Sequence, residues 1–310
     1  MENHLTLGAA ALRKAALNEE AKIYILDNEL LFNVFKKAAN RYIGGDTLEE
    51  TIPKVLKENK DGHKCSIEFM GENAKTEMEA LAATDEFIKI CETIKGNEFN
   101  ASISLDLSHI GLNISRELAL DNLRQICKSA GNNEVIISAE GVNMTDSIID
   151  TYKEASKNHN NLGITLQAYL HRSKDDFADL LNYPGRIRIV KGAFETPAGY
   201  SIPRSTELND IYLDYIDTLL FRRHRCSIAT HHDIIQQEAK KLVNLYASHK
   251  SCYEFESLYG IQQEQLAVLK EEGYMTKVYF VYGREWYLYV CNRIAEYPMN
   301  IFTALADISQ

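Results

Sequence analysis

The sequence predicts an α/β protein of the (β/α)8 TIM-barrel type with an N-terminal helical extension. Three observations lead to this prediction: eight short apolar runs bounded by turn residues, helical patterns between those runs, and no G-x-G-x-x-G motif after any of them. Strands that alternate with helices form parallel βαβ units, and eight units match the roughly 250 residues of a closed barrel. A doubly wound open sheet is the competing architecture, and the missing glycine motif disfavours it.

The predicted strands are, in chain order, Cys65–Met70, Ala101–Leu107, Val135–Ala139, Gly163–Ala168, Arg186–Lys191, Cys226–Ala229, Ser251–Glu256 and Thr276–Val281. The fifth is typical, because Pro184-Gly185 precedes it and Gly192 follows it. A short β-branched run between such residues favours a buried strand over a helix. Apolar residues at helical spacing predict intervening helices over Lys75–Ile94, Glu207–Leu220, His232–Tyr246 and Gly260–Gly273.

The first 60 residues do not show this alternation. Their apolar spacing predicts helices over Ala11–Ala16, Ala21–Asn28 and Leu30–Ile43. Residues 44–50 predict a turn and a new helix start, capped by Thr47 and Glu50. We therefore expect residues 1–60 to form a helical arm over the bottom or side of a barrel built from residues 61–310.

Composition narrows the class of partner and the compartment. The formal net charge is −10 and the basic residues are scattered, which excludes the electrostatic footprint of a nucleic-acid-binding protein. No apolar run approaches the roughly 18 residues of a membrane span, and the N-terminus lacks the apolar core of a signal peptide. The six cysteines occur singly, as thiols do in a reducing compartment. We expect a cytoplasmic protein, with peripheral membrane contact left open.

Polar residues follow the predicted strands at the end where a (β/α)8 barrel carries its chemistry. They are Glu72, Asp106, His109, Ser138, Glu140, Gln167, Tyr169, Arg188, Lys191, Thr230, His231, His232, Glu256, Tyr259, Tyr279 and Tyr282. A last helix from about Arg284 adds Tyr289, Asn292, Arg293 and Glu296, whose spacing of three and four places them on one face. This set suits a large, planar, anionic cofactor. We expect no metal, because adjacent histidines point apart and no third ligand is suitably spaced.

Several motifs, in this order and spacing, resemble the FAD-dependent proline dehydrogenases, whose catalytic domain is a distorted (β/α)8 barrel. The resemblance extends from about Gly44 to Phe302. The segments that carry it are 44–50, Leu107–Asn113, Gln167–Leu170, Arg188–Ala193, Ala229–His231, Phe255–Gly260 and Tyr282–Tyr287. No single segment decides the matter, and their combination is specific.

The resemblance implies bound FAD and a set of contacts for it. Arg188 resembles the family arginine beside the flavin N5 edge, where a fixed cation favours the anionic reduced flavin. Gln167 resembles the glutamine that hydrogen-bonds the ring. Lys191, Gly192 and Arg204 would hold the ribityl and pyrophosphate groups, next to Val190 and Ala193. The adenosine end would meet Thr230, His231 and His232, and Glu296 would bind the ribose.

The substrate pocket departs from the family pattern in its charges. In the family a lysine on an early strand and two consecutive arginines on the last helix bind the proline carboxylate. These positions are Asp106 and Asn292-Arg293 in this sequence. An aspartate next to a substrate carboxylate in a partly desolvated pocket costs up to several kcal/mol. Either Asp106 turns toward Arg293, or the substrate is not proline.

Two further pocket positions differ, since Ser138 replaces an aspartate and Phe194 replaces a tyrosine, while Tyr279, Tyr289 and Leu258 match the family. The activity implied is oxidation of the C–N bond of proline or a proline-like amine to an imine, by hydride transfer to FAD. Electrons would then pass to a quinone-like acceptor or to oxygen. The residues expected to act directly are Arg188, Tyr279, Tyr289, Arg293, Asp106 and Asn292.

Three alternatives stay open at this point. In the first, the barrel binds FAD but oxidises a different amine. In the second, it binds FAD as a catalytically weak regulatory homologue. In the third, it binds no flavin and uses the mouth for a phosphorylated substrate.

Overall fold

The computed structural model describes residues 18–71, 73–296 and 300–309, together with Leu7, Ala11 and Lys14. Most of the helix predicted over Ala11–Ala16 lies outside these residues, and so does Glu72. None of the described helices combines the length and the apolar character needed to cross a bilayer.

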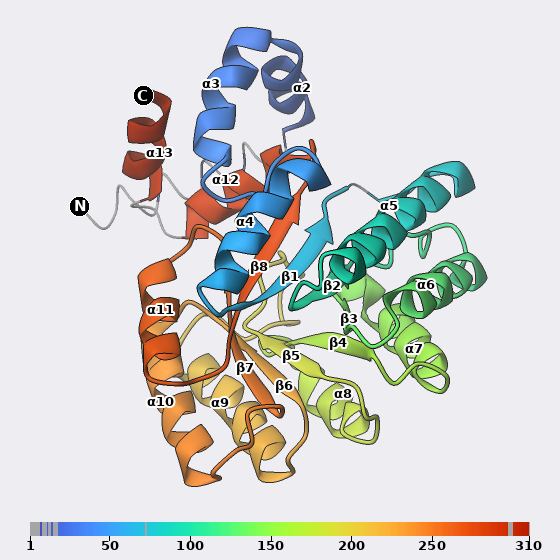
Figure 1. Cartoon of the computed structure of the whole chain (residues 1–310), viewed down its shortest axis with the longest axis vertical. Coiled ribbons are helices and arrows are strands. Elements are labelled where there is room, and N and C mark those ends of the chain that lie inside the picture. The colour runs from blue at the N-terminus through green and yellow to red at the C-terminus, as the bar shows by residue number, and fades with distance from the viewer. Residues whose placement is uncertain are drawn as a thin grey trace.

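Eight parallel strands close into one barrel in sequential order, which confirms the predicted fold (Figure 1). The strands are β1 Lys64–Phe69, β2 Ala101–Leu105, β3 Val135–Ile137, β4 Leu162–Gln167, β5 Ile187–Val190, β6 Cys226–Ala229, β7 Tyr253–Leu258 and β8 Thr276–Tyr282. The ring closes where β8 pairs with β1, with Cys65 opposite Val278 and Phe69 opposite Tyr282. The predicted strand ends differ from these by no more than two residues.

Helices surround the barrel between successive strands (Figure 1). They are α5 Glu77–Gly96, α6 Arg116–Ala130, α7 Thr145–Ser156, which follows the short 3-10 helix η1 Val142–Met144, α8 Ser173–Leu180, α9 Thr206–Phe221, α10 Asp233–Leu245 and α11 Gln263–Glu271. Side-chain caps explain where several of them begin. The Thr76 hydroxyl accepts from the Glu79 N–H at 3.2 Å, and the Glu79 carboxylate accepts from the Thr76 N–H at 3.3 Å. The helices predicted from apolar spacing are thus confirmed.

The helix from the N-terminal segment, α4 (Leu48–Lys60), packs against β1 and β8 on the outside of the barrel. Its start is the predicted one, because the Thr47 hydroxyl accepts from the Glu50 N–H at 3.3 Å. Gly44 precedes it and donates to the Val281 carbonyl at 2.7 Å. A Cβ at Gly44 would lie 2.5 Å from Thr51, so this glycine is needed for close packing.

The remaining helices gather above the strand carboxyl ends of β1 and β8 (Figure 1). They are α2 Glu19–Asp27, α3 Glu29–Ala39, α12 Trp286–Glu296 and α13 Asn300–Ser309. Apolar side chains of α12 pack with Met70 and Val281, which lie at the ends of these strands. The helix predicted over Leu30–Ile43 ends earlier, at Ala39, and a turn follows in which Tyr42 and Ile43 are buried. The division of the chain at residue 60 stays a prediction.

The interior of the barrel is ionic at the amino-terminal ends of its strands. Lys64 Nζ lies 2.6 Å from Glu134 Oε2, and Arg186 Nε lies 2.9 Å from Glu134 Oε1. Lys277 is completely buried and pairs with Glu254. Burial raises the pKa of the Glu254 carboxyl, but Arg186, Lys277 and Lys64 outweigh burial and hold its pKa well below the usual value. These buried charges are therefore paired inside the barrel, and the ion pairs connect the strands whose carboxyl ends form the mouth.

Candidate active site at the strand carboxyl ends

Arg188 lies at the centre of the predicted site. It is 3% exposed and its side chain crosses the barrel interior. Its Nη1 donates to the Ser104 hydroxyl on β2 at 3.0 Å and to the Thr165 hydroxyl on β4 at 3.4 Å, and its Nε lies 3.0 Å from Glu256 Oε1 on β7. Three strands besides its own thus hold the guanidinium. This is a fixed cation in a water-poor site.

Tyr279 links this cation to a carboxylate that the sequence analysis did not include. The Arg188 guanidinium lies 4.9 Å from the centre of the Tyr279 ring. The Tyr279 hydroxyl donates to Glu68 Oε2, and the Ser138 hydroxyl donates to the same oxygen at 2.9 Å. The hydroxyl oxygens of Ser104 and Ser138 are hydrogen-bonded to each other at 3.0 Å. Strands β1, β2 and β8 and the segment after β3 therefore contribute to one hydrogen-bonded group around Glu68.

The site is rich in carboxylates. Burial, followed by the neighbouring Glu68 and Glu140, raises the pKa of Asp106 well above its usual value, while Arg188 acts in the opposite direction. Burial also raises the pKa of Glu140, although the Ser108 N–H donates to its Oε1 at 3.2 Å. Asp106 directly follows β2, and the charged groups that shift its pKa, Glu68, Glu140 and Arg188, all belong to the site described above. The charges that act on Asp106 thus come from the barrel mouth.

A group of cations lies at the ends of β5 and β6. Burial and the neighbouring Arg204 lower the pKa of Lys191 to about 8. Burial and Lys191 in turn lower the pKa of His232, which is the residue before α10. Arg204 Nη2 donates to the Gly192 carbonyl at 3.1 Å. Cations that repel one another near a helix start favour an anionic ligand.

Helix α12 brings its predicted residues to the same end. The Arg293 guanidinium lies 5.2 Å from the centre of the Tyr289 ring. Burial and Arg293 lower the pKa of His231 to about 4, so this imidazole is neutral at neutral pH. His231 Nε2 accepts from the Leu258 N–H at 2.9 Å, which ties the end of β6 to that of β7. Asn292 is half-buried on α12. The side chain of Glu296 is outside the described part of the chain.

The other predicted cofactor residues lie between these groups. Gln167 Nε2 donates to the Glu140 carbonyl at 3.0 Å, and the Gln167 main-chain oxygen accepts from the Ser173 hydroxyl at 2.5 Å. Among the described residues no hydrogen bond reaches the side-chain Oε1 of Gln167. Thr230 Oγ1 accepts from the His232 N–H at 3.1 Å. Gly192 has φ +111°, and a Cβ there would lie 2.1 Å from the ring of Tyr169. Val190 is half-buried before this turn, and Ala193 is exposed after it.

Two residues expected at the mouth lie elsewhere, and this is a correction. Tyr282 is three residues after Tyr279, so alternation turns it outward, and its hydroxyl donates to Glu86 on α5 at 2.7 Å. His109 packs against Phe69, with ring centres 5.1 Å apart. The Phe194 side chain is 47% exposed, and its place in the substrate pocket stays a prediction. Tyr282 ends β8 and His109 follows β2, and the side chains of both are turned away from the barrel axis.

Glu68 was missed because the only residue considered for the first strand was Glu72, which follows it. It lies within β1, in a strand where Lys64 and Ser66 share its inner face. The sequence did contain a signal for Glu68. It is an acidic residue two positions after Ser66, on the same face of a buried strand. Among the described residues, no group of three His, Cys, Asp or Glu side chains is arranged to hold a metal ion.

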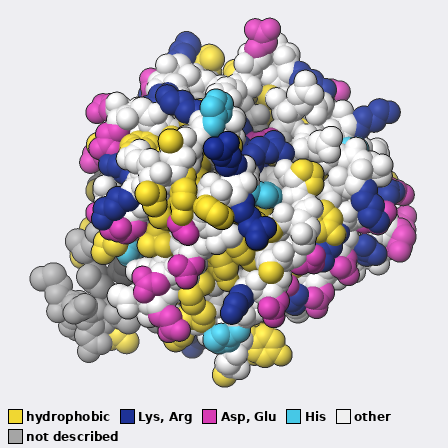
Figure 2. All heavy atoms as spheres, turned by 90° about the horizontal axis from the view of Figure 1, so that it is seen from below, with side chains coloured by type: hydrophobic (Ala, Val, Ile, Leu, Met, Phe, Trp, Pro, Cys, Tyr) yellow, Lys and Arg dark blue, Asp and Glu magenta, His cyan; other side chains and the backbone are white. Residues whose placement is uncertain are grey.

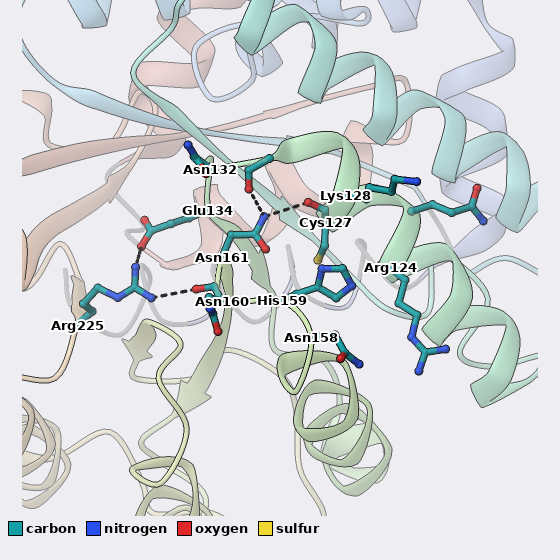
Figure 3. A pocket seen from close by; sticks show the side chains of 12 residues that line it. Arg124, Cys127, Lys128, Asn132, Glu134, Asn158, His159, Asn160, Asn161 and Arg225 are labelled. Carbon is teal, nitrogen blue, oxygen red and sulfur yellow. Dashed lines mark hydrogen bonds and ion pairs between the residues drawn. The ribbon is translucent and has the colours of Figure 1, made fainter.

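A hollow of about 690 Å³ lies at the opposite end of the barrel, next to the loops that precede β3, β4 and β6 (Figure 3). Its polar groups serve the fold. Asn161 Nδ2 donates to the carbonyls of Cys127, Gly131 and Asn133, and Arg225 lies 3.3 Å from Glu134. Catalytic groups of such barrels lie at the carboxyl ends of the strands. The candidate site is therefore the mouth and not this hollow.

Both signs of charge are interspersed on the face shown in Figure 2, where several Lys and Arg side chains gather near the centre beside apolar ones.

Comparisons with known proteins all identify proline dehydrogenases as similar to this chain. A family model described as proline dehydrogenase matches residues 51–289. Proline dehydrogenase 1 of Bacillus subtilis strain 168 is 34% identical over 274 residues, which are 87% of this chain and 90% of that protein. Proline dehydrogenase 2 of the same strain is 30% identical over 278 residues, 88% of this chain and 91% of that protein.

A solved structure shares the fold. It is that of proline utilization A (PutA) from Bdellovibrio bacteriovorus inactivated by N-propargylglycine, with a TM-score of 0.80 and 18% sequence identity. The match covers 94% of this chain but only 37% of the PutA chain.

Proposed function

The chain belongs to the proline dehydrogenase family, and on this basis we propose that it is an FAD-dependent oxidoreductase that oxidises the C–N bond of proline or a proline-like amine to an imine. The observation that carries the proposal is Arg188, a buried cation held by side chains of three other strands at the barrel mouth. A fixed cation at this place stabilises negative charge that develops on a bound cofactor.

The residues present fit FAD. Arg188 Nη2 is buried and has no hydrogen-bond partner among the described residues, so a donor is left for a ligand. Lys191 and Arg204 form the cationic group that would hold the pyrophosphate, and His232 lies beside Lys191 at the start of α10. The side-chain oxygen Oε1 of Gln167 would accept a hydrogen bond from the flavin ring. FAD, when bound, supplies the acceptor for the hydride that leaves the substrate carbon.

The remaining groups orient the amine. Tyr279 and Tyr289 present aromatic rings that already stack with Arg188 and Arg293, which limits their movement. A small cyclic amine would lie between these two rings. Asp106 would act on the charge of that amine. The protein would thus orient the substrate, exclude water from the site and hold charged groups at fixed positions. We further propose a cytoplasmic enzyme that passes its electrons to a quinone-like acceptor or to oxygen.

The pH dependence of FAD binding follows from Lys191. Its pKa is about 8 without a ligand, so the ammonium that binds the pyrophosphate is present below pH 8 and is lost above it. We expect the affinity for FAD to be flat from pH 6 to about 7 and to fall as the pH rises through 8. Titrations of the apoprotein followed by flavin fluorescence would measure this. In the Lys191→Met variant the fall should disappear, and an unchanged profile in that variant would contradict the assignment.

An anaerobic titration tests the proposed function itself. The purified protein, saturated with FAD, is mixed with L-proline and with a panel of cyclic and linear amines. Loss of the flavin absorbance with at least one amine supports the proposal. A protein that binds no FAD would contradict the cofactor assignment, and one that binds FAD but is bleached by no amine would contradict the activity.

A further inference from the structure

Two arginines at β5 face two glutamates of β7 across the barrel interior. Arg186, the residue before β5, has its Nε 3.6 Å from Glu254 Oε1, and Arg188 Nε lies 3.0 Å from Glu256 Oε1. Residues two apart along a strand point to the same face, so the two ion pairs lie one above the other. All four side chains are buried.

The two ion pairs differ in their surroundings. Glu254 belongs to the ionic cluster at the amino-terminal ends of the strands, where Lys64 and Lys277 also pair with it. Glu256 has fewer partners, since Lys277 Nζ lies 3.7 Å from its Oε2 and no hydrogen bond reaches that oxygen among the described residues. Glu256 is thus the one carboxylate, in the described part of the chain, that forms an ion pair with Arg188.

The contacts of Arg188 leave one donor for a ligand. Its Nη1 donates to the hydroxyls of Ser104 and Thr165, and its Nε faces Glu256. The ring of Tyr279 lies 4.9 Å from the guanidinium. A guanidinium is a rigid planar fork, so partners that fix Nε and Nη1 also fix Nη2, which is buried and has no hydrogen-bond partner among the described residues. The only charged partner in this set is Glu256.

We propose that Glu256 is a positioning residue, which orients Arg188 toward FAD and, by offsetting part of its charge, sets the reduction potential of the bound flavin. This inference rests on the proposed function, because it concerns the same cofactor. A fixed cation favours the anionic reduced flavin, and a carboxylate 3.0 Å behind that cation weakens its field. With Glu256 in place the flavin is therefore harder to reduce than it would be beside Arg188 alone.

Two substitutions separate the charge of Glu256 from its contact with Arg188. Glu256→Gln keeps the shape and the acceptor oxygen but removes the charge. It should retain the native Kd for FAD and shift the reduction equilibrium about tenfold toward reduced flavin, which is a rise of about 30 mV for a two-electron couple. Glu256→Leu removes the contact as well, so Arg188 loses its fixed orientation and FAD should bind at least about tenfold more weakly.

The potential is measured on the FAD-loaded protein with dithionite and reference dyes, and the Kd on the apoprotein by flavin fluorescence. Glu254→Gln is the matched control, because it removes an equally buried carboxylate from the same face of β7. It should lower the thermal midpoint and leave the potential at its native value. If Glu256→Gln does not fold, Lys277→Met is added to remove the ammonium that lost its partner. The potential should rise there too, since Arg188 keeps its charge and loses its carboxylate.

Failure of this inference is distinct from failure of the proposed function. An unchanged or lower potential in Glu256→Gln, or an equal shift in Glu254→Gln, would leave Glu256 with a structural role only and overturn the inference. A native Kd for FAD in Glu256→Leu would refute the orienting role. Amines that fail to bleach the flavin refute the proposed activity alone, because the potential is measured without an amine. A native protein that binds no FAD would refute both.

Discussion

Replacement of Arg188 by alanine is expected to weaken FAD binding by at least about tenfold and to lower the reduction potential of the bound flavin. The guanidinium is buried and is the fixed cation of the inner cluster, so its loss removes the charge that favours the reduced anionic flavin. A drop of about 30 mV in a two-electron couple corresponds to a tenfold change in equilibrium. Potentials measured by equilibration with reference dyes and Kd values from flavin fluorescence would show both effects.

The Arg188 experiment needs a control for folding. Arg188 pairs with Glu256 at 3.0 Å, and removal of one partner of a buried pair leaves the other charge uncompensated, which typically costs about 3–5 kcal/mol of stability. Arg188→Lys keeps the charge and should retain most of the potential while it loses the hydrogen bonds to Ser104 and Thr165. An alanine variant that is fully occupied by FAD with an unchanged potential would refute the role assigned to Arg188.

The barrel was predictable because its signals are local. Each strand is a short apolar run with its own turn residues, and each helix has its own spacing and caps, so errors did not accumulate along the chain. Thr47 and Glu50 are an example, since a four-residue pattern defined the start of α4. What this pattern could not show is that α4 packs between β8 and β1 while α12 packs over the strand ends. That arrangement depends on contacts between residues more than 200 positions apart.

The site was predictable only in part, because position after a strand does not determine direction. Arg188, Gln167 and Tyr279 were expected at the mouth and their contacts lie there. Tyr282 was expected there too, but it faces α5. Glu68 was overlooked since it is one acid inside a strand, and only the closed ring brings it within hydrogen-bond distance of Ser138, 70 residues away. The roles of these residues toward FAD and substrate stay predictions.

The sequence also left open whether Asp106 turns toward Arg293. The structure shows that the charges which shift the pKa of Asp106 are Glu68, Glu140 and Arg188. Arg293 instead stacks on Tyr289 and acts on His231. Arg293 is thus not among the charges that shift the pKa of Asp106, and a preferred substrate that lacks the carboxylate of proline stays a prediction.

The double variant Asp106→Lys with Asn292→Arg is therefore expected to raise kcat/KM for L-proline by more than tenfold over the native protein. Asp106 lies in a field made by Glu68 and Glu140, so a lysine there has two carboxylates to pair with and replaces a repulsive neighbour of the substrate by an attractive one. Asn292 lies on α12 beside Arg293, and an arginine at this position adds a bidentate donor for a carboxylate. Steady-state rates with a fixed artificial acceptor would measure the gain.

The single variants and a neutral control show which charge matters. Asp106→Asn removes the anion without adding a cation, and it should recover part of the gain through a lower KM. Asn292→Arg alone should gain less, since Asp106 would remain beside the substrate and would compete for the new guanidinium. Ser138 and Phe194 are left unchanged in all variants, so any effect belongs to the two charges. Native turnover of L-proline that already equals that of the Bacillus subtilis relatives, or no gain in the double variant, would mean that Asp106 is turned from the substrate and that the carboxylate is bound by other groups, Arg293 first among them.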